Sequence, residues 1–356
     1  MSPDLQWWET FGDASKGPRN MADDKFFITT PIYYVNFKPH VGTSYTTILT
    51  DVVSRVERLR GKRALLVTGS DEHSQNIADL AEEAGMAPRA YCDTIIPKFT
   101  ECWDLVQIQD YRFERTSDEK HRQTVQAFWK QIYERGDVYK GEYAGWYHTS
   151  DNRYLEEDEV PENPEEHPRL KYLTEESYYF KLSAYQDWLL AFHEANPNFV
   201  VPEFRRNEML SRIQGGLKDI CISRTSTDWG IALPWDSGHV FYVWVDALLT
   251  YLTGSGFDLE AFDATRDAEG RSREVKEPLW ETAREDLVSQ PDGNYWPADL
   301  QVMAKDIPWF HAVIWPAMWA SFGGPPPKKM LVHGYWQFDG EKMSKSYNNT
   351  IEIFEP

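Results

Sequence analysis

The first part of the chain alternates short apolar runs with a helical pattern. Residues 26–30 have the pattern of a buried strand, and residues 64–68 form a second apolar run. Between them, apolar side chains recur at helical spacing from Ser44, and Gly61 can end that helix. A strand, a glycine loop, a helix and a second strand in this order predict a right-handed βαβ unit with parallel strands.

Later apolar patterns extend this prediction along the chain. The predicted elements are a helix over 117–135, strands over 240–245 and 300–303, and a buried helix over 306–320. Aromatic and acidic side chains crowd residues 141–180 without a regular period, so we expect irregular structure there. Residues 254–294 are polar and charge-rich, which indicates a surface excursion. The fold class expected is α/β, with a Rossmann-type parallel sheet and a mixed connective insertion domain.

Charge and cysteine usage narrow the functional classes. The chain has 356 residues, with 37 Lys and Arg against 57 Asp and Glu, which gives a net charge of −20. This balance excludes a uniform basic coat for gripping nucleic acid, although a local basic groove stays open. The three cysteines include no CxxC pair, so we expect no disulfide framework and a reducing, cytoplasmic setting. Residues 1–24 lack the apolar core of a signal peptide, and no apolar run approaches the length of a membrane span.

The loop between the first strand and helix is a candidate phosphate site. It reads PHVGTS over Pro39–Ser44, where a helix start would offer unpaired N–H groups to an anion. Gly42 would let a nucleotide approach the backbone, and His40 could donate to a phosphate in a transition state. The alternative is an ordinary turn in which Thr43 or Ser44 caps the helix and His40 is a surface residue. Taken alone, the motif favours that ordinary turn.

A second motif changes this balance. Residues 342–346 read KMSKS, and flexible point-charge lysines can follow a moving pyrophosphate. Such a loop alone is usually a solvated surface. The two motifs stand in a fixed order on opposite halves of the chain, and that pairing is specific to a phosphate-handling site.

Together with the segments between them, these motifs resemble the class I aminoacyl-tRNA synthetases, and most closely the methionyl-tRNA synthetases. The family's signature His-Ile-Gly-His is matched by His40–Thr43, and Lys-Met-Ser-Lys-Ser by Lys342–Ser346 without change. The segments TTPIYYVN, TGSDEHSQ, CISRTSTDWGIALPW, YVWVDALLTY, MAKDIPWFHAVIWPAM and LVHGYW are similar to the family's catalytic stretches, in order, from residue 26 onwards.

The resemblance implies that methionine or a close analogue is activated with ATP and Mg²⁺ to an aminoacyl-adenylate, with release of pyrophosphate. It assigns the catalytic roles to His40, Thr43, Lys342 and Lys345. It assigns ATP binding to these four together with Gly42 and Asp306. Such a reaction needs positioning and charge stabilisation rather than a covalent enzyme intermediate.

The resemblance also implies an amino-acid pocket. Asp71 matches the position that holds the substrate α-amino group, a role that suits a carboxylate. The residues implied in binding the amino acid are Ile32, Tyr34, Asp71, Trp244, Ala247, Leu248, Tyr251, Ile307 and His311. Aromatic and aliphatic walls suit an unbranched thioether. The alternative is that Trp244, Tyr251 and Ile307 are plain core residues.

Two local departures from the family pattern matter. Thr43 replaces the second histidine of the first signature, and its shorter, uncharged side chain could slow adenylation or alter the ATP geometry. The family's knuckle often carries zinc cysteines, whereas this chain offers only His148, Asp151 and His167 there. We therefore expect no structural zinc and no other resident metal.

The expected segments are a polar leader over 1–25, the first Rossmann half over 26–117, a connective insertion with the knuckle over 118–238, the second Rossmann half over 239–333, and a lysine-loop segment over 334–356. The family normally continues into a helical stem-contact region and an α-helical anticodon-binding domain. Because the chain ends at Pro356, we expect both to be absent.

Three functions remain open. The first is the catalytic part of a methionine–tRNA ligase, with tRNA as a partner through a missing C-terminal domain or through its acceptor end. The second is a tRNA-independent paralogue that passes the acyl group to a small-molecule amine, a hydroxylamine or a carrier in a biosynthetic pathway. The third is a non-catalytic binding protein, which ranks last because His40, Lys342 and Lys345 are all present. No membrane partner is expected.

Overall fold

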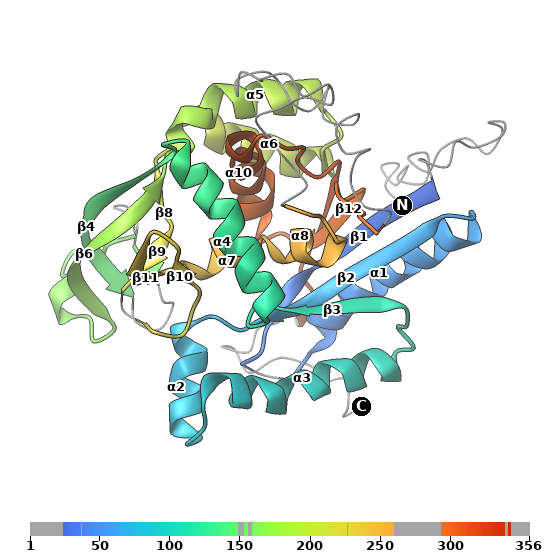
Figure 1. Ribbon diagram of the computed structural model, residues 1–356, viewed down its shortest axis with the longest axis horizontal. Coiled ribbons are helices and arrows are strands. Elements are labelled where there is room, and N and C mark those ends of the chain that lie inside the picture. Colours follow the sequence, from blue (N-terminus) through green and yellow to red (C-terminus); the bar gives the residue numbers. More distant parts are fainter. Residues whose placement is uncertain are drawn as a thin grey trace.

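A six-stranded parallel sheet forms the centre of the computed structural model (Figure 1). The structure describes residues 24–36, 38–148, 153–155, 159–225, 227–259, 293–338 and 341–342. The strands follow the order β3 (Tyr111–Arg115), β2 (Arg63–Asp71), β1 (Lys25–Tyr34), β12 (Leu300–Ala304), β13 (Met330–His333) and β7 (Val200–Val201). Every neighbouring pair is parallel, which confirms the expected Rossmann-type fold class.

The central strands are buried on both faces. They confirm the strands predicted over 26–30, 64–68 and 300–303 as β1, β2 and β12. Phe26 and Ile28 of β1 pack on the face that α1 (Val41–Leu59) covers, whereas Phe27 packs on the other face. This alternation is the two-residue period of a strand.

The first helix, α1, begins earlier than the pattern predicted, at Val41 rather than Ser44. Its N-cap is His40, whose Nδ1 accepts a hydrogen bond from the Gly42 N–H at 3.0 Å. The alternative in which Thr43 or Ser44 caps the helix is therefore wrong. The imidazole takes the capping role that short hydroxyl or carboxylate side chains usually have.

The face of α1 that packs on the sheet is rich in hydroxyl side chains. Thr47 and Thr50 are fully buried, and each hydroxyl donates to the carbonyl four residues earlier, at 3.1 and 2.7 Å. The larger side chains of Ile48 and Val52 are exposed by 39% and 50%. Small hydroxyls let the helix lie close to the strands, because their polar atoms are satisfied within the helix. Gly61 follows the helix with φ 85°, which confirms the predicted stop.

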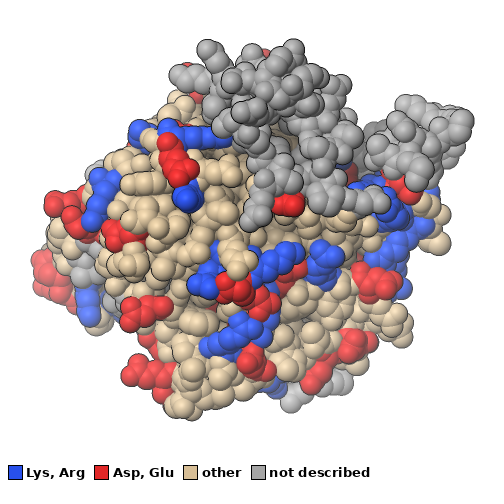
Figure 2. All heavy atoms as spheres, in the orientation of Figure 1, with Lys and Arg blue, Asp and Glu red and all other residues tan. Residues whose placement is uncertain are grey.

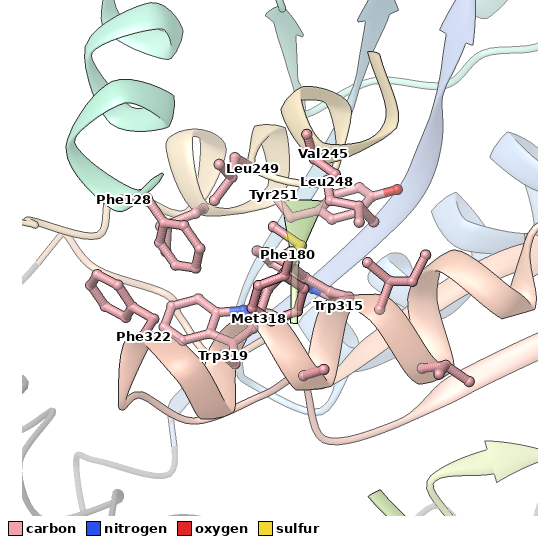
Figure 3. Close-up of a cluster of buried hydrophobic side chains, with 14 of the residues drawn as sticks. Phe128, Phe180, Val245, Leu248, Leu249, Tyr251, Trp315, Met318, Trp319 and Phe322 are labelled. Atoms are coloured by element: carbon pink, nitrogen blue, oxygen red, sulfur yellow. The ribbon is translucent and has the colours of Figure 1, made fainter. Parts of the chain in front are cut away.

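The largest core cluster lies on the opposite face of the sheet, under α4 (Glu119–Glu134), α8 (Thr250–Ser255) and α10 (Trp315–Phe322). Helix α4 confirms the helix predicted over 117–135. In Figure 3, Trp319 lies among Phe128, Trp315 and Phe322, with ring centroids 5.5, 5.4 and 5.5 Å away. The Phe128 contact, together with the stacking of Phe128 on Phe322 at 4.3 Å, joins α4 to α10.

The buried helix predicted over 306–320 is confirmed, but it contains a π-helical turn. Phe310–Ile314 form this turn, and α10 continues from it and ends at Gly323 with φ 89°. The extra residue of such a turn shifts the side chains that follow it. The apolar pattern could not reveal the shift, because α10 is buried on all sides.

The prediction of irregular structure over 141–180 is wrong at both ends of this range, whereas residues 159–169 between them contain only turns, bends and a 3₁₀ turn. At the two ends, β4 (Val138–His148) and β6 (Leu170–Phe180) form a long antiparallel pair. Aromatic side chains meet across the pair, as in the stacked Tyr139 and Tyr179 rings, whose centroids are 5.5 Å apart. Cross-strand pairs of this kind stabilise a sheet even where the sequence shows no clean alternation.

The remaining elements are smaller and complete the fold. They are α2 (Gln75–Glu83), α3 (Pro88–Leu105), β5 (Arg153–Tyr154), the 3₁₀ turns Pro164–Glu166 and Leu182–Tyr185, α5 (Gln186–Ala195), α6 (Glu203–Gln214), β8 (Ile220–Cys221), β9 (Ser223–Arg224), β10 (Ala232–Leu233), β11 (Asp236–Phe241), α7 (Val243–Ala247), β14 (Gln337–Phe338) and β15 (Glu341–Lys342). The order β5-β4-β6-β8 forms a four-stranded sheet, and β10-β11-β9 a three-stranded one.

Two further expectations need correction. The strand predicted over 240–245 is right only to Phe241, because Val243–Ala247 form the helix α7 despite their β-branched valines. The surface excursion predicted over 254–294 begins later, since Gly254 and Ser255 are buried at the end of α8. Residues 260–292 and the predicted leader up to residue 23 lie outside the described residues.

The expected division into segments stays a prediction. β7 lies within residues 118–238, the expected connective insertion, yet it pairs with β13 in the central sheet. All three cysteines are free thiols, in agreement with the absence of a disulfide framework. Within the described part of the chain, no helix combines the length and apolarity that crossing a membrane requires.

The charged side chains are mixed rather than segregated on the face that Figure 2 shows. Lys and Arg side chains lie there among Asp and Glu side chains. Oppositely charged side chains also form surface ion pairs, such as Arg89 with Asp118 at 2.7 Å and Arg58 with Asp110 at 3.3 Å. Exposed pairs of this kind contribute little stability, so the fold rests on its core.

Candidate active site

A cavity of about 540 Å³ opens where the central strands of the sheet end. Its lining includes the residues predicted from the sequence on the described chain, namely Ile32, Tyr34, His40, Gly42, Thr43, Asp71, Trp244, Ala247, Leu248, Tyr251, Asp306, Ile307 and His311. The carboxyl ends of parallel strands are where open α/β sheets bind ligands. The side chain of Lys342, in β15, is not described, and Lys345 lies outside the described residues.

The N-terminus of α1 forms one wall of the cavity. Because the Nδ1 of His40 accepts the Gly42 N–H, that nitrogen carries no proton, and the neutral ring holds its proton on Nε2. A Cβ atom on Gly42 would lie 2.9 Å from Cε1 of the His40 ring. Only glycine therefore lets the ring fold back over the backbone. The result is a donor fixed beside a helix N-terminus, an arrangement that suits phosphate.

Hydroxyl and imidazole groups tie this wall to the neighbouring strand. Thr46 on α1 lies 2.7 Å from Nε2 of His333, at the end of β13. The Nδ1 of His333 donates to the Gly334 carbonyl at 2.7 Å, so Nε2 is the acceptor of the Thr46 hydroxyl. Burial lowers the pKa of His333, which keeps the ring neutral in this role. Thr43 also lines the cavity, next to this link.

A buried carboxylate marks the other side of the cavity floor. Asp71 ends β2, is only 3% exposed, and has an Oδ1 atom without a hydrogen-bond partner among the described residues. Burial, and after it the charges of Asp246 and Glu72, raises the pKa of Asp71 well above its ordinary value. A buried, unpaired acceptor is costly, and a ligand ammonium would satisfy it. Tyr34 of β1 lies opposite Asp71 in the strand register.

The apolar part of the cavity is built from α7, α8 and the π turn. Trp244 stacks on Phe310 with ring centroids 3.9 Å apart. The Tyr251 hydroxyl donates to Nε2 of His311 at 2.8 Å, and Nδ1 of His311 donates to the Ile307 carbonyl at 3.0 Å. Burial lowers the pKa of His311 to about 4, so the ring is neutral.

The core alternative for the aromatic residues is partly right. Tyr251 belongs to the main core cluster and also lines the cavity, whereas Trp244 lines the cavity outside that cluster. Ile307 packs against the cluster and also lines the cavity. Tyr251 and Ile307 therefore contribute both to the core and to the lining of the cavity.

Several lining residues were missed by the sequence analysis. They are Pro31, Tyr33, Asn36, Lys38, Thr46, Phe99, Ala304, His333, Gly334, Tyr335 and Trp336. Lys38 could have been found from its place two residues before His40, because a cationic side chain beside a candidate phosphate loop would attract the phosphate. His333 could have been found in the segment LVHGYW, because it is a polar residue directly after a buried strand. Phe99 carried no signal, since it comes from α3.

The knuckle residues do not form a metal site among the residues that are described. The rings of His148 and His167 are 6.2 Å apart between centroids, and Asp151 lies outside the described residues. No group of three or more His, Cys, Asp or Glu side chains able to hold an ion occurs in the described ranges. The expectation that no structural zinc is bound stays a prediction.

The fold and the cavity together define an α/β domain of the nucleotide-binding type, with a ligand site at the carboxyl edge of its sheet. The family of class I tRNA synthetases, type M, matches residues 26–167 and 162–355. The chain belongs to this family, and the resemblance stated from its motifs is confirmed.

Relatives with assigned names support the same placement. The chain is 43% identical over 336 residues to a methionine–tRNA ligase of Thermotoga maritima, covering 92% of this chain and 49% of the relative. It is 41% identical over 337 residues to a methionine–tRNA ligase of a Nostoc species, covering 94% of this chain and 59% of the relative. The chain thus spans about half to three-fifths of the length of these relatives.

Solved structures agree with these sequence relatives. The chain is similar to Mycobacterium tuberculosis methionyl-tRNA synthetase bound by methionyl-adenylate, with a TM-score of 0.78 and 37% identity, covering 92% of this chain and 60% of that one. It is also similar to the apo form of that synthetase, with a TM-score of 0.68 and 35% identity, covering 88% of this chain and 56% of that one.

Proposed function

We propose that the chain binds ATP and methionine in this cavity and converts them to methionyl-adenylate with release of pyrophosphate. The observation that carries the proposal is that one cavity holds both a His40-capped helix start and the Asp71 oxygen that has no partner among the described residues. Relatives named methionine–tRNA ligase, and a similar structure with bound methionyl-adenylate, support methionine as the substrate.

The phosphate end of the reaction falls to the α1 wall. The substrate carboxylate oxygen attacks the α-phosphorus, and the bond from this phosphorus to the oxygen that bridges to the β-phosphate breaks. His40 donates from Nε2 to the phosphate oxygen on which charge builds, and the backbone N–H of Thr43 adds to this stabilisation, because that of Gly42 already donates to His40. Mg²⁺ enters with ATP as part of the substrate, and it screens the charge of the phosphates. Asp306, which also lines the cavity, is assigned to the nucleotide side.

The amino-acid end falls to Asp71 and the apolar wall. Asp71 accepts the substrate ammonium, which offsets the burial that otherwise favours its protonated form. The side chain then lies against the aromatic and aliphatic wall that includes Trp244, Ile307 and His311. A thioether packs well on aromatic edges, and the neutral His311 places no charge in its path.

Lys342 and Lys345 are assigned to the leaving pyrophosphate. The backbone supports this assignment for Lys342, because β15 pairs with β14 in the register Gln337↔Lys342. Gln337 directly follows Trp336, which lines the cavity. The hairpin that carries Lys342 therefore starts at the rim of the site.

The acyl acceptor is proposed to be tRNA. This step rests on the names of the relatives rather than on a surface of this chain, which spans only part of their length. The test is attachment of labelled methionine to tRNA by the chain, compared with transfer to hydroxylamine. Esterified tRNA is the expected product, and transfer to hydroxylamine at a higher rate than to tRNA would contradict it. The cytoplasmic setting expected from the cysteines stays a prediction.

The activation step is tested by ATP–pyrophosphate exchange with each of the twenty amino acids, without tRNA. We expect methionine to support the fastest exchange, with other amino acids well below it. Norvaline and ethionine extend the series, because their side chains differ from that of methionine by small steps in length. Each step is worth about 1–3 kcal/mol of binding free energy in such a pocket. Faster exchange with another natural amino acid would contradict the methionine assignment.

A further inference from the structure

A fully buried carboxylate lies directly behind the cavity wall. Asp246, on α7, has no exposed surface, and each of its two oxygen atoms accepts a histidine N–H. Nδ1 of His73 lies 2.6 Å from Oδ2, and Nε2 of His121 lies 2.7 Å from Oδ1. We refer to Asp246, His73 and His121 as the carboxylate clamp. None of the three lines the cavity, and none was among the residues predicted for the site.

The clamp joins three separate segments of the fold. His73 follows β2, His121 lies on α4, and Asp246 lies on α7. The second ring nitrogen of His121 contacts the Thr253 hydroxyl of α8 at 2.9 Å. The His73 ring packs edge-on against Trp229, with centroids 5.1 Å apart. Each histidine is therefore held from a second side, which fixes the direction of its bond to Asp246.

The charge on Asp246 depends on the clamp. Burial alone would raise the pKa of this carboxyl group, but the charge of His73 and the hydrogen bonds from both histidines hold its pKa below the ordinary value. A buried carboxylate with two such donors is stable only while both are in place, since loss of one leaves a desolvated oxygen unsatisfied. The clamp thus resists separation of its three segments.

The clamp connects the two parts of the amino-acid site. His73 stands two residues after Asp71, which ends β2 and faces the cavity. Asp246 stands between Trp244 and Ala247, which belong to the apolar wall. A shift between the end of β2 and α7 would change the distance from the ammonium-binding carboxylate to the side-chain pocket. A second bond ties α4 to α7, from Nε1 of Trp129 to the Val245 carbonyl at 3.1 Å.

We propose that Asp246 is a positioning residue for amino-acid recognition, which with His73 and His121 sets the spacing between Asp71 and the apolar wall. The inference rests on the proposed function, because it names the element that fixes the amino-acid half of that site. The clamp acts on the amino acid and leaves the nucleotide half, built on α1 and β13, unchanged. A change in the clamp should therefore alter the KM for methionine and leave the KM for ATP unchanged.

The first variant removes the charge and keeps the shape. In Asp246→Asn, the amide nitrogen faces one of the two histidine donors, so one hydrogen bond is lost. We expect the KM for methionine in ATP–pyrophosphate exchange to rise about tenfold, with the KM for ATP within about twofold of the wild type. The matched control is Asp110→Asn, at a carboxylate that is 77% exposed and does not line the cavity. It should leave both constants unchanged.

The second set of variants tests the donor atoms themselves. The amide nitrogen of asparagine can stand where His73 presents Nδ1, and that of glutamine where His121 presents Nε2. We expect His73→Asn and His121→Gln to keep the methionine KM within about threefold of the wild type. The exchanged pair, His73→Gln and His121→Asn, should raise it about tenfold. The rise should be larger at His73, because the Trp129 bond still holds α4 to α7.

The outcomes separate this inference from the proposed function. Wild-type chain without methionine-dependent exchange would overturn the proposed function and the inference together. Active wild type with an unchanged methionine KM in Asp246→Asn would overturn the inference alone. The inference also fails if the KM for ATP rises as much as that for methionine. It fails as well if the methionine KM values of the four histidine variants follow only their melting temperatures. A packing role would not depend on whether the new amide nitrogen stands at the position of the lost donor atom.

Discussion

The N-terminus of α1 forms one side of the cavity, and α7, α8 and the π turn form the other. The α1 side uses small residues, a glycine and hydroxyls, and its functional ring is held by a backbone N–H. The apolar side uses large buried rings, and its polar groups are paired with one another inside the core. A ligand atom can therefore approach the backbone closely on the α1 side, whereas shape decides what fits on the apolar side. The difference teaches that the side proposed to bind the nucleotide depends on backbone geometry, and the side proposed to bind the amino acid depends on packing.

The largest expected effect tests the α1 side at its functional ring. In His40→Ala the donor at Nε2 is lost, and we expect kcat for ATP–pyrophosphate exchange to fall about 10²–10³-fold, the usual cost of one transition-state donor. Methionine binding, measured by calorimetry without ATP, should change by less than about twofold, since His40 lies at the N-terminus of α1, on the phosphate side of the proposed site. Loss of methionine binding in this variant would contradict the separation of the two sides.

The next effect tests the amino-acid half. Asp71→Asn keeps the size of the side chain but removes the charge that is proposed to receive the substrate ammonium. We expect kcat/KM for methionine to fall by about 30-fold, which is about 2 kcal/mol, within the range for a hydrogen bond to a charged group. The measurement is exchange kinetics with methionine varied at saturating ATP. An unchanged kcat/KM would show that Asp71 does not receive the substrate.

A smaller effect tests the close approach at Gly42. Gly42→Ala places a Cβ 2.9 Å from the His40 ring and forces the ring out of its position. Moving a side chain off its preferred rotamer costs about 1 kcal/mol, so we expect kcat for exchange to fall roughly fivefold to tenfold. Thr46→Ser is the matched control on the same helix, because it keeps the hydroxyl that faces His333. A Gly42→Ala variant with wild-type kcat would contradict the proposed role of the ring orientation.

The smallest effect concerns the pH dependence of stability on the apolar side. Burial lowers the pKa of His311 to about 4, and burial likewise lowers that of His193 to about 4. Since these values lie below that of an exposed histidine, the unfolded chain binds protons first, and the stability that the neutral rings contribute is full above about pH 6.5 and is lost as pH falls towards 4. We expect His311→Gln to reduce the loss over this window by about 3 kcal/mol.

The readout for this pH prediction is the free energy of unfolding in urea at pH 4, 5, 6 and 7. His167→Gln, at an exposed position on the knuckle, is the matched control and should leave the profile unchanged. An identical profile for His311→Gln and the wild type would contradict a buried neutral ring at this position.

The sequence predicted the parallel core and most of the site because both depend on short, local signals. Strands over 26–30 and 64–68 are continuous apolar runs, and the described residues carried over from the family, Lys342 apart, all line one cavity. The β4–β6 pair was missed because its stability comes from pairing between strands that are distant in sequence. His40 as the cap of α1 was missed because imidazole is an unusual N-cap, so the pattern favoured the hydroxyls that follow.

Other parts of the site depend on tertiary contacts that no local pattern contains. His333 joins Thr46 across 287 positions of the chain, and Asp246 joins His73 across 173. The sequence shows that such residues are polar and that they follow a strand or lie in a short helix. It does not show which residues they contact. The π turn at Phe310–Ile314 belongs to the same class, because its surroundings are apolar on every side.

The most direct test of the account is a single-turnover reaction of the purified chain with methionine and ATP labelled at the α-phosphate, in the presence of pyrophosphatase. We expect the label to appear as methionyl-adenylate bound to the chain, only when methionine is present, and to be much reduced in Asp71→Asn and in His40→Ala. The account is contradicted if labelled ATP stays intact with methionine, or if the labelled product forms equally well without it.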